Sequence, residues 1–161
     1  MSGSQSGDQQ QPAVHFGGGG EREALLLDYD LPALSPGRLE RAFLILSPLP
    51  DAPQGAQPVR VSAWRLTEDW TRPRPLHPPL AARPSAQGIA SAPLPLRIDV
   101  TALVRRWLEN RTSTFGLVLK SSSTEGHPQV FATGVGGGHS PVLELYHAAA
   151  APTQAGPGAA R

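Results

Sequence analysis

The chain has 161 residues, which is enough for one folded domain, and 39% of them are hydrophobic, which is enough to build a core. Its 14 basic and 13 acidic residues leave a formal net charge of +1, too balanced for a protein whose main task is to bind nucleic acid. It has no cysteine, which excludes disulfides and thiolate metal sites, and no apolar run near the ~20 residues that span a membrane.

Both ends of the chain are expected to be tails outside the fold. Residues 1–13 are polar, and the stretch MSGSQSGDQQQPAV has neither the basic nor the apolar region of a signal peptide. Residues 148–161 read AAAAPTQAGPGAAR, a low-complexity segment in which proline and glycine oppose a helix. The folded domain is therefore predicted to cover residues 14–147.

Seven or eight short strands are predicted between these tails, because apolar residues alternate with polar ones in short runs that glycine and proline separate. The runs are VHF at 14–16, REALLLDYDLP at 22–32, RLERAFLILSPLP at 38–50, PVRVSAWRL at 58–66, FGLVLKSSS at 115–123, QVFAT at 129–133 and VLELYH at 142–147. Residues 69–95 contain seven prolines and are expected to be a long crossover without regular structure.

One stretch, RIDVTALVRRWLENR at 97–111, has the spacing of a helix. Its apolar residues recur three and four apart and form one stripe, made of Val100, Leu103, Val104, Trp107 and Leu108. Asp99 or Thr101 can cap the N-terminus, and Arg105 and Arg106 are expected to face solvent. The predicted fold is an all-β, jelly-roll-like antiparallel sandwich with this one short amphipathic helix packed on it or capping it. Its predicted core includes Leu103, Val104, Trp107, Leu108 and Phe115.

Five segments resemble a known family in their order and spacing. They are EREALLLDYDLPAL, RLERAFLIL, VSAWRLTEDWT, IDVTALVRRWLENRTSTFGLVLKSSS and VFATGVGGGHSPVLELYH. Together they resemble the DNRLRE-type domain, which is similar to the alginate-binding group of carbohydrate-binding modules. The helix and the strand after it also resemble the prodomain of transforming growth factor beta proteins. The resemblance covers residues 14–147 and implies a jelly-roll sandwich on a bacterial surface or secreted protein, and hence an extracellular location.

The side chains that could carry chemistry do not suggest an enzyme. The five histidines, at positions 15, 77, 127, 139 and 147, lack the spacing of metal ligands, and no nucleophile elbow or phosphate loop is present. Asp28 and Asp30 could place two carboxylates on one face of a strand for acid–base work or calcium, although Asp30 also reads as a turn residue before Leu31-Pro32. Neither catalysis nor a cofactor is expected.

A binding surface is expected instead around the strand at 58–66. Trp64 falls on the face opposite the apolar residues of that strand, and arginines cluster around it in the sequence. The candidate ligand-binding residues are Trp64, Arg60, Arg65, Arg72 and Arg74. Guanidinium groups suit carboxylates, so the hypothesis is a non-catalytic module for an anionic polysaccharide. For Trp64 the alternative is packing under the proline-rich loop. For the chain the alternative is a structural or assembly module whose partner is a protein, with the tails as linkers.

Overall fold

A computed structural model describes residues 13–18, 24–69, 78–111, 115–122, 126–134 and 140–149. In this part of the chain there are nine strands, one α-helix and one short 3-10 helix. In chain order these are β1 (Ala13–Phe16), β2 (Ala24–Leu27), η1 (Pro36–Arg38), β3 (Leu39–Leu46), β4 (Val59–Arg65), β5 (Ala86–Ala90), β6 (Leu96–Asp99), α1 (Thr101–Glu109), β7 (Leu117–Ser121), β8 (Gln129–Ala132) and β9 (Val142–His147). The predicted tails lie almost entirely outside the described residues.

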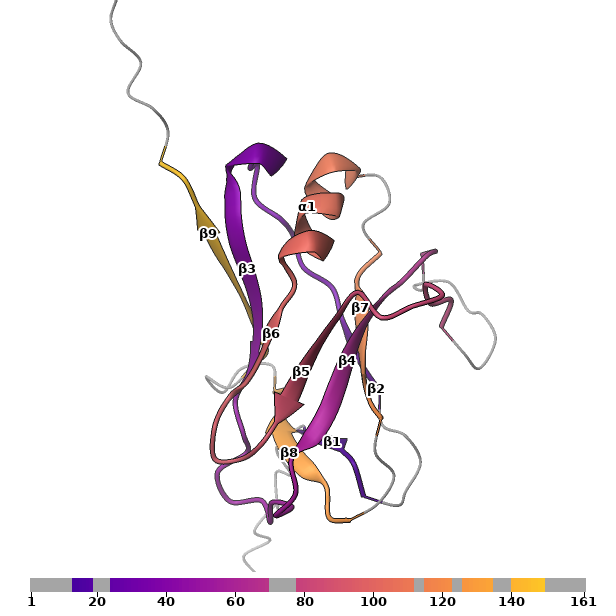
Figure 1. The fold of residues 1–161 in the computed structure, drawn as a ribbon, viewed down its shortest axis with the longest axis vertical. Helices are drawn as coiled ribbons and strands as arrows, with labels where there is room; N and C mark the ends of the chain where they lie inside the picture. Colours follow the sequence, from indigo (N-terminus) through magenta and orange to yellow (C-terminus); the bar gives the residue numbers. More distant parts are fainter. Residues whose placement is uncertain are drawn as a thin grey trace, which may run out of the picture.

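The strands form a two-layer antiparallel sandwich (Figure 1). One layer has the order β2-β7-β4-β5, and the other contains β6-β3-β9 together with the pair β1-β8. Strand β8 joins the second layer just beyond the end of β3, where the Leu49 N–H donates to the Val130 carbonyl and the Ala132 N–H donates to the Ser47 carbonyl. The order β1-β8-β3-β6 opposite β2-β7-β4-β5 is that of a jelly roll, which confirms the predicted fold. Strand β9 is an additional strand on the remaining length of β3.

The core lies between the two layers and follows the alternation read from the sequence. Strand β3 contributes Ala42, Leu44 and Leu46, each with no measurable exposure. Across from it, Val61 and Leu119 point inward, while their sequence neighbours Ser62 and Lys120 are placed on the outer face by the register. The predicted period of two in residues 58–66 is therefore confirmed.

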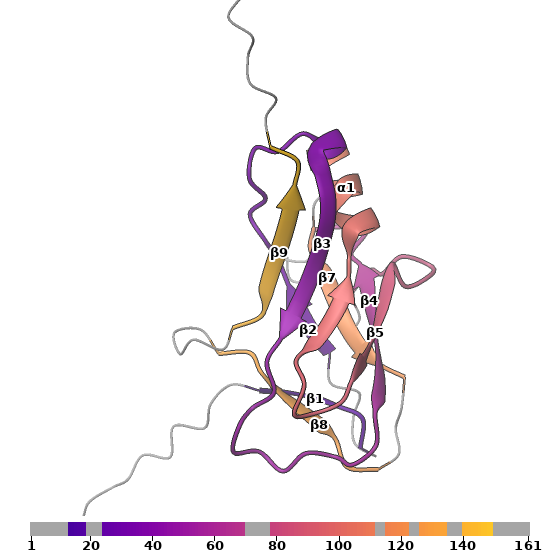
Figure 2. The same cartoon turned by 60° about the vertical axis from the view of Figure 1, so that its left-hand side comes forward.

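Helix α1 closes one end of the sandwich, beside β3 and η1 (Figure 2). The predicted stripe is confirmed, because Val100, Leu103, Val104, Trp107 and Leu108 are all buried. Arg105 and Arg106 are both exposed, as expected, and Arg105 also makes hydrogen bonds to β3. Its guanidinium donates to the Leu39 carbonyl at 2.9 Å and to the Glu40 carbonyl at 3.4 Å, which fastens the helix to the start of β3.

Two segments expected to be irregular or helical are strands. Strand β5 lies inside the predicted crossover, and β6 occupies the first residues of the predicted helix. The sequence of β5, AQGIA, has only Ile89 as a strong strand former, so its pairing with β4 decides its structure. A Cβ at Gly88 would lie 2.8 Å from Ile98 Cγ1, which shows how closely β5 approaches β6 at this edge.

Phe115 is half-buried and lies outside the buried cluster, so its predicted place in the core is wrong. The prediction continued the alternation of Leu117 and Leu119 backwards to Phe115. Gly116, however, has a φ of 89°, a conformation that ends the extended backbone before β7 begins. The side chain of Phe115 therefore does not belong to the inward row of that strand.

Asp99 lies at the junction of β6 and α1, and its carboxylate should make the free energy of unfolding depend on pH. One carboxylate oxygen, Oδ1, accepts the Thr101 N–H at 3.0 Å and the Thr101 hydroxyl at 2.6 Å, while Oδ2 lies 3.4 Å from Arg41. The hydrogen bonds from Thr101, with a smaller contribution from Arg41, lower the pKa of Asp99 below its ordinary value of 3.8. This stabilisation is present above pH 3.8 and is lost as the pH falls through the lower pKa of the folded state.

We expect Asp99→Ala to lower the free energy of unfolding at pH 7 by about 1 kcal/mol, as loss of a helix-capping carboxylate does. The difference from the wild type should shrink when urea denaturation is repeated below the pKa of Asp99. The matched control is Arg41→Ala, which removes only an exposed ion pair and should cost less than about 0.5 kcal/mol. A pH-independent loss in Asp99→Ala would contradict the role of the carboxylate.

Candidate functional site

The outer side of the four-stranded layer carries the predicted tryptophan. The register of β4 against β7 pairs Ser62 with Lys120 and Trp64 with Val118, so these four side chains share the outer face. Val118 is only 2% exposed although it points away from the core, and it lies between Trp64 of β4 and Leu26 of β2. We call the surface formed by Ser62, Trp64, Val118, Lys120 and Ser122 the Trp64 face.

The Trp64 face contains a hollow of about 290 Å³, lined by Ser62, Trp64, Lys120, Ser121 and Ser122. The indole and the lysine are both half-buried, so each keeps part of its surface open to a ligand. Gln87 Nε2 donates to Ser62 Oγ at 3.2 Å, and the Ser122 hydroxyl donates to the Arg60 carbonyl at 3.4 Å. An aromatic surface, an ammonium group and hydroxyls therefore surround one hollow.

The paired strands carry cations at two of their outward positions. Strands β2, β7, β4 and β5 place ten residues at outward positions or directly beside them: Ala24, Leu26, Val118, Lys120, Ser122, Arg60, Ser62, Trp64, Gln87 and Ile89. These ten include Arg60 and Lys120 but no aspartate or glutamate. These ten positions therefore carry a net positive charge, although the chain as a whole is nearly neutral.

The structure brings together only some of the predicted ligand-binding residues. Trp64 is on the outer face, and Arg60 is exposed on the same side of β4. Arg65 is on the opposite side of the strand, aligned with the core residue Leu117, so this candidate does not share the face of Trp64. Its guanidinium donates to the adjacent Leu66 carbonyl at 3.4 Å. Arg72 and Arg74 lie outside the described residues.

Lys120 is a site residue that the sequence did not indicate. Its own strand, β7, showed the alternation that sends it outward, but nothing local says that β7 pairs with β4. The pairing joins residues 61–65 with residues 117–121, and only this register brings the ammonium group to the tryptophan. The period of two in each strand could be read from the sequence. Which strand pairs with β7 could not.

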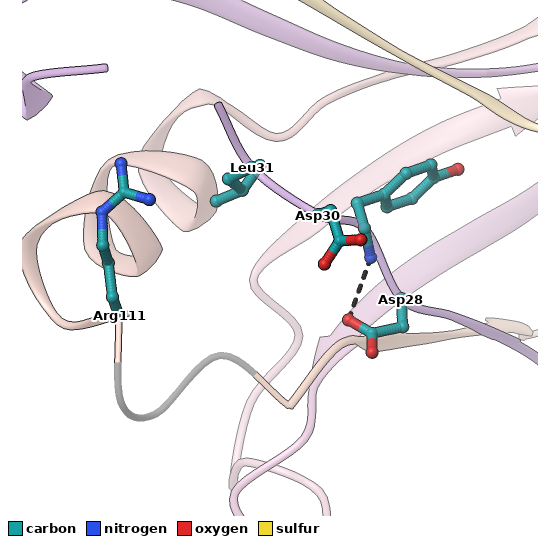
Figure 3. Close-up of a pocket in the computed structure, with 5 residues that line it drawn as sticks. Asp28, Asp30, Leu31 and Arg111 are labelled. Atoms are coloured by element: carbon teal, nitrogen blue, oxygen red, sulfur yellow. Dashed lines mark hydrogen bonds between the residues drawn. The ribbon is translucent and has the colours of Figure 1, made fainter. Parts of the chain in front are cut away.

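The two aspartates form a separate hollow of about 260 Å³, together with Tyr29, Leu31 and Arg111 (Figure 3). Strand β2 ends at Leu27, so the predicted strand does not extend to Asp28 and Asp30. Asp28 Oδ1 accepts the Tyr29 N–H at 2.9 Å. Arg111 lies apart from the carboxylates in Figure 3, with Leu31 between them, and its guanidinium donates to the Pro32 carbonyl at 2.8 Å.

Asp28 and Asp30 are the only two potential metal ligands among the residues that line this second hollow. Within the described part of the chain no three His, Cys, Asp or Glu side chains gather where they could hold a metal ion. His15, His127 and His147 are exposed on three separate segments, and His77 and His139 lie outside the described residues. The hypothesis of calcium or acid–base chemistry at Asp28 and Asp30 therefore gains no support from a third ligand.

Tyr29, between the two aspartates, has a structural contact. Its hydroxyl donates to the Pro141 carbonyl at 3.2 Å, which ties the connection after β2 to the start of β9. Burial raises the pKa of Tyr29 to about 12, so the phenol stays protonated and remains a donor over the physiological range.

Comparisons of the chain with protein-family models, with curated proteins and with solved structures found no match in any of the three. The resemblance to the DNRLRE-type domain therefore stays a prediction. Among the described residues no helix has both the length and the apolar character needed to cross a membrane. The function has to be inferred from the geometry of the surfaces.

Proposed function

We propose that this chain is a non-catalytic carbohydrate-binding module that recognises an anionic polysaccharide on the Trp64 face. The observation that carries the proposal is the single hollow in which Trp64 and Lys120 meet. The C–H faces of a sugar ring are apolar and pack well on an indole, while an ammonium group attracts a carboxylate on the same ring. The chemistry of this pair matches a uronate unit.

The size and position of the hollow support a polymer as the ligand. Its volume of about 290 Å³ is at the lower end of the range of small-molecule pockets, and it lies on the outer face of a sheet. A surface of this kind contacts one ring of a chain at a time and leaves both ends of the chain free. Arg60, on the same face of β4, offers a second cation to a neighbouring unit.

The experiment is a retardation series in native gels that contain alginate, polygalacturonate or a neutral glucan. We expect the wild type to be retarded by the two uronate polymers, less so as salt is raised, and not by the neutral one. Trp64→Ala should weaken the interaction at least tenfold, as loss of a central aromatic contact does, and Lys120→Ala should weaken it several-fold.

Arg106→Ala is the matched control for charge, because it removes one exposed cation from helix α1, which is not part of the Trp64 face. It should leave the retardation unchanged. Equal retardation of the wild type and Trp64→Ala would refute the site, and equal retardation by neutral and acidic polymers would refute the anionic ligand.

A further inference from the structure

Strand β9 is an edge strand whose outer backbone groups have no partner strand in the described part of the chain. It is the outermost strand at the left of Figure 1 and pairs with β3 on its other side. The Ala148 N–H donates to the Arg38 carbonyl, and the direction of backbone groups alternates along a strand. The peptide groups of Val142, Glu144 and Tyr146 therefore face β3, and those of Leu143, Leu145 and His147 point away from it.

This edge lacks some of the features that usually prevent strands from pairing with other chains, although its own pairing with β3 has a register shift between Leu39 and Arg41. With six residues, β9 is the longest of the edge strands that the structure describes, and it contains neither proline nor lysine. Its outer face carries two of the exposed large apolar side chains, Val142 at 50% and Tyr146 at 47%. A long and partly apolar edge is a template for another strand.

We propose that β9 pairs antiparallel with β9 of a second copy of this chain, around a two-fold axis at Leu145. In this register Leu145 lies opposite Leu145 of the second copy, and Leu143 lies opposite His147. All three outward-pointing residues of each strand are then hydrogen-bonded. The result is a continuous sheet with the order β6-β3-β9-β9-β3-β6, which has closed two-fold symmetry.

The side chains on the outer face favour this register. It places Tyr146 opposite Glu144 of the second copy, and within one chain the Tyr146 hydroxyl already donates to Glu144 Oε2 at 3.0 Å. In the dimer the Tyr146 hydroxyl of each copy can therefore donate to Glu144 of the other copy instead of to its own Glu144. A register shifted so that Leu143 pairs with Leu145 would place the two Glu144 carboxylates directly opposite each other, which destabilises a strand pair. An axis at Leu143 would leave His147 unpaired.

The pairing involves only the layer that contains β9. The Trp64 face belongs to the other layer and stays open, so the two proposals do not depend on each other. A chain that dimerises without binding a polysaccharide would leave this inference intact.

Sedimentation equilibrium of the full chain over a wide concentration range tests the pairing. We expect the mass of the wild type to rise to that of a dimer. Tyr146→Glu should weaken the dimer at least tenfold, because it places Glu opposite Glu twice, whereas Tyr146→Lys should keep it, because it creates two Lys–Glu pairs. Ile89→Glu is the matched control, since Ile89 is 55% exposed on the edge strand β5 of the other layer and should have no effect.

The absence of cysteine allows a direct test of the register. Positions 144 and 146 would form a pair without mutual hydrogen bonds, with Cα atoms about 4.5 Å apart, within the range for a disulfide. A mixture of Glu144→Cys and Tyr146→Cys chains should therefore form a disulfide-linked dimer under mild oxidation, and neither variant should do so alone.

Three results would overturn the proposal. A wild type that stays monomeric at every concentration refutes the dimer, and dissociation caused by Ile89→Glu but not by Tyr146→Glu refutes the use of β9. Self-linking of Glu144→Cys alone refutes the register.

Discussion

Replacing Trp107 with alanine is expected to lower the free energy of unfolding by about 3–5 kcal/mol. Trp107 is only 1% exposed and is the largest of the fully buried side chains in the described part of the fold. It belongs to the helix that closes the end of the sandwich, so its removal leaves a cavity among residues of both the helix and the layers. Urea denaturation of the two proteins at pH 7 measures the difference. A loss below about 1 kcal/mol would mean that α1 does not close the core.

Trp107→Phe separates packing from hydrogen bonding at the same position. The indole Nε1 is the buried side-chain polar atom for which the described structure shows no hydrogen-bond partner. An unpartnered buried donor costs about 1–3 kcal/mol, and phenylalanine removes that donor while it keeps an aromatic ring. We therefore expect Trp107→Phe to cost less than half as much as Trp107→Ala. Equal losses would show that Nε1 has a partner in solution.

Gln129→Leu is expected to destabilise the fold by about 2–4 kcal/mol, because it removes a buried amide that bonds three backbone groups of two loops. Gln129 is 1% exposed; its Nε2 donates to the carbonyls of Gly55 and Gln57, and its Oε1 accepts the Ala92 N–H at 2.8 Å. Leucine has a similar volume but leaves these three backbone groups without their partner. Water can reach Gln57, which is exposed, so the cost is expected mainly from Gly55 and Ala92.

The control for this change is Gln87→Leu, which removes an amide with one hydrogen bond, to Ser62, from an exposed position. It should change the free energy of unfolding by less than about 0.5 kcal/mol in the same urea experiment. Equal effects of the two substitutions would mean that the loops around Gln129 are held by other contacts.

The parts of the fold that were predictable are those in which local pattern and burial agree. The stripe on α1 repeats every three and four residues, and β3 and β4 alternate, so each of them specifies its own buried side. Strand β5 could not be predicted in this way, because Ala86, Gln87 and Gly88 have weak strand preference and their structure depends on pairing with β4. Asp99 looked like a helix cap, and the carboxylate does accept a helix amide although the residue itself ends β6.

The candidate site was predictable to the same extent. Trp64 and Arg60 are separated by an even number of positions and share a face, whereas Arg65 follows Trp64 directly and could have been excluded by the same alternation. Lys120 required knowledge of a pairing between segments more than fifty residues apart. The role of Gln129 was equally hidden, because its three partners come from two distant loops and have no local signature.

Together the two proposals give a dimer with two polysaccharide-binding Trp64 faces. A two-fold axis between antiparallel edge strands runs perpendicular to the sheet, so both Trp64 faces would lie on the same side of the dimer. A polymer that contacts both faces would be held by avidity, which adds to affinity without any new contact. Tyr146→Glu should then weaken retardation by a long polysaccharide more than by a short oligosaccharide.

The jelly-roll order also determines when this chain can fold. Strand β1 begins at Ala13 but pairs with β8 at residues 129–132, and β3 completes its sheet only with β9 at residues 142–147. Few stabilising contacts can therefore form between residues close in sequence, which places the chain among the slowly folding proteins. During synthesis the early strands would leave the ribosome long before their partners. Until about His147 emerges, the apolar sides of β3 and β4 stay open to the solvent and to chaperones.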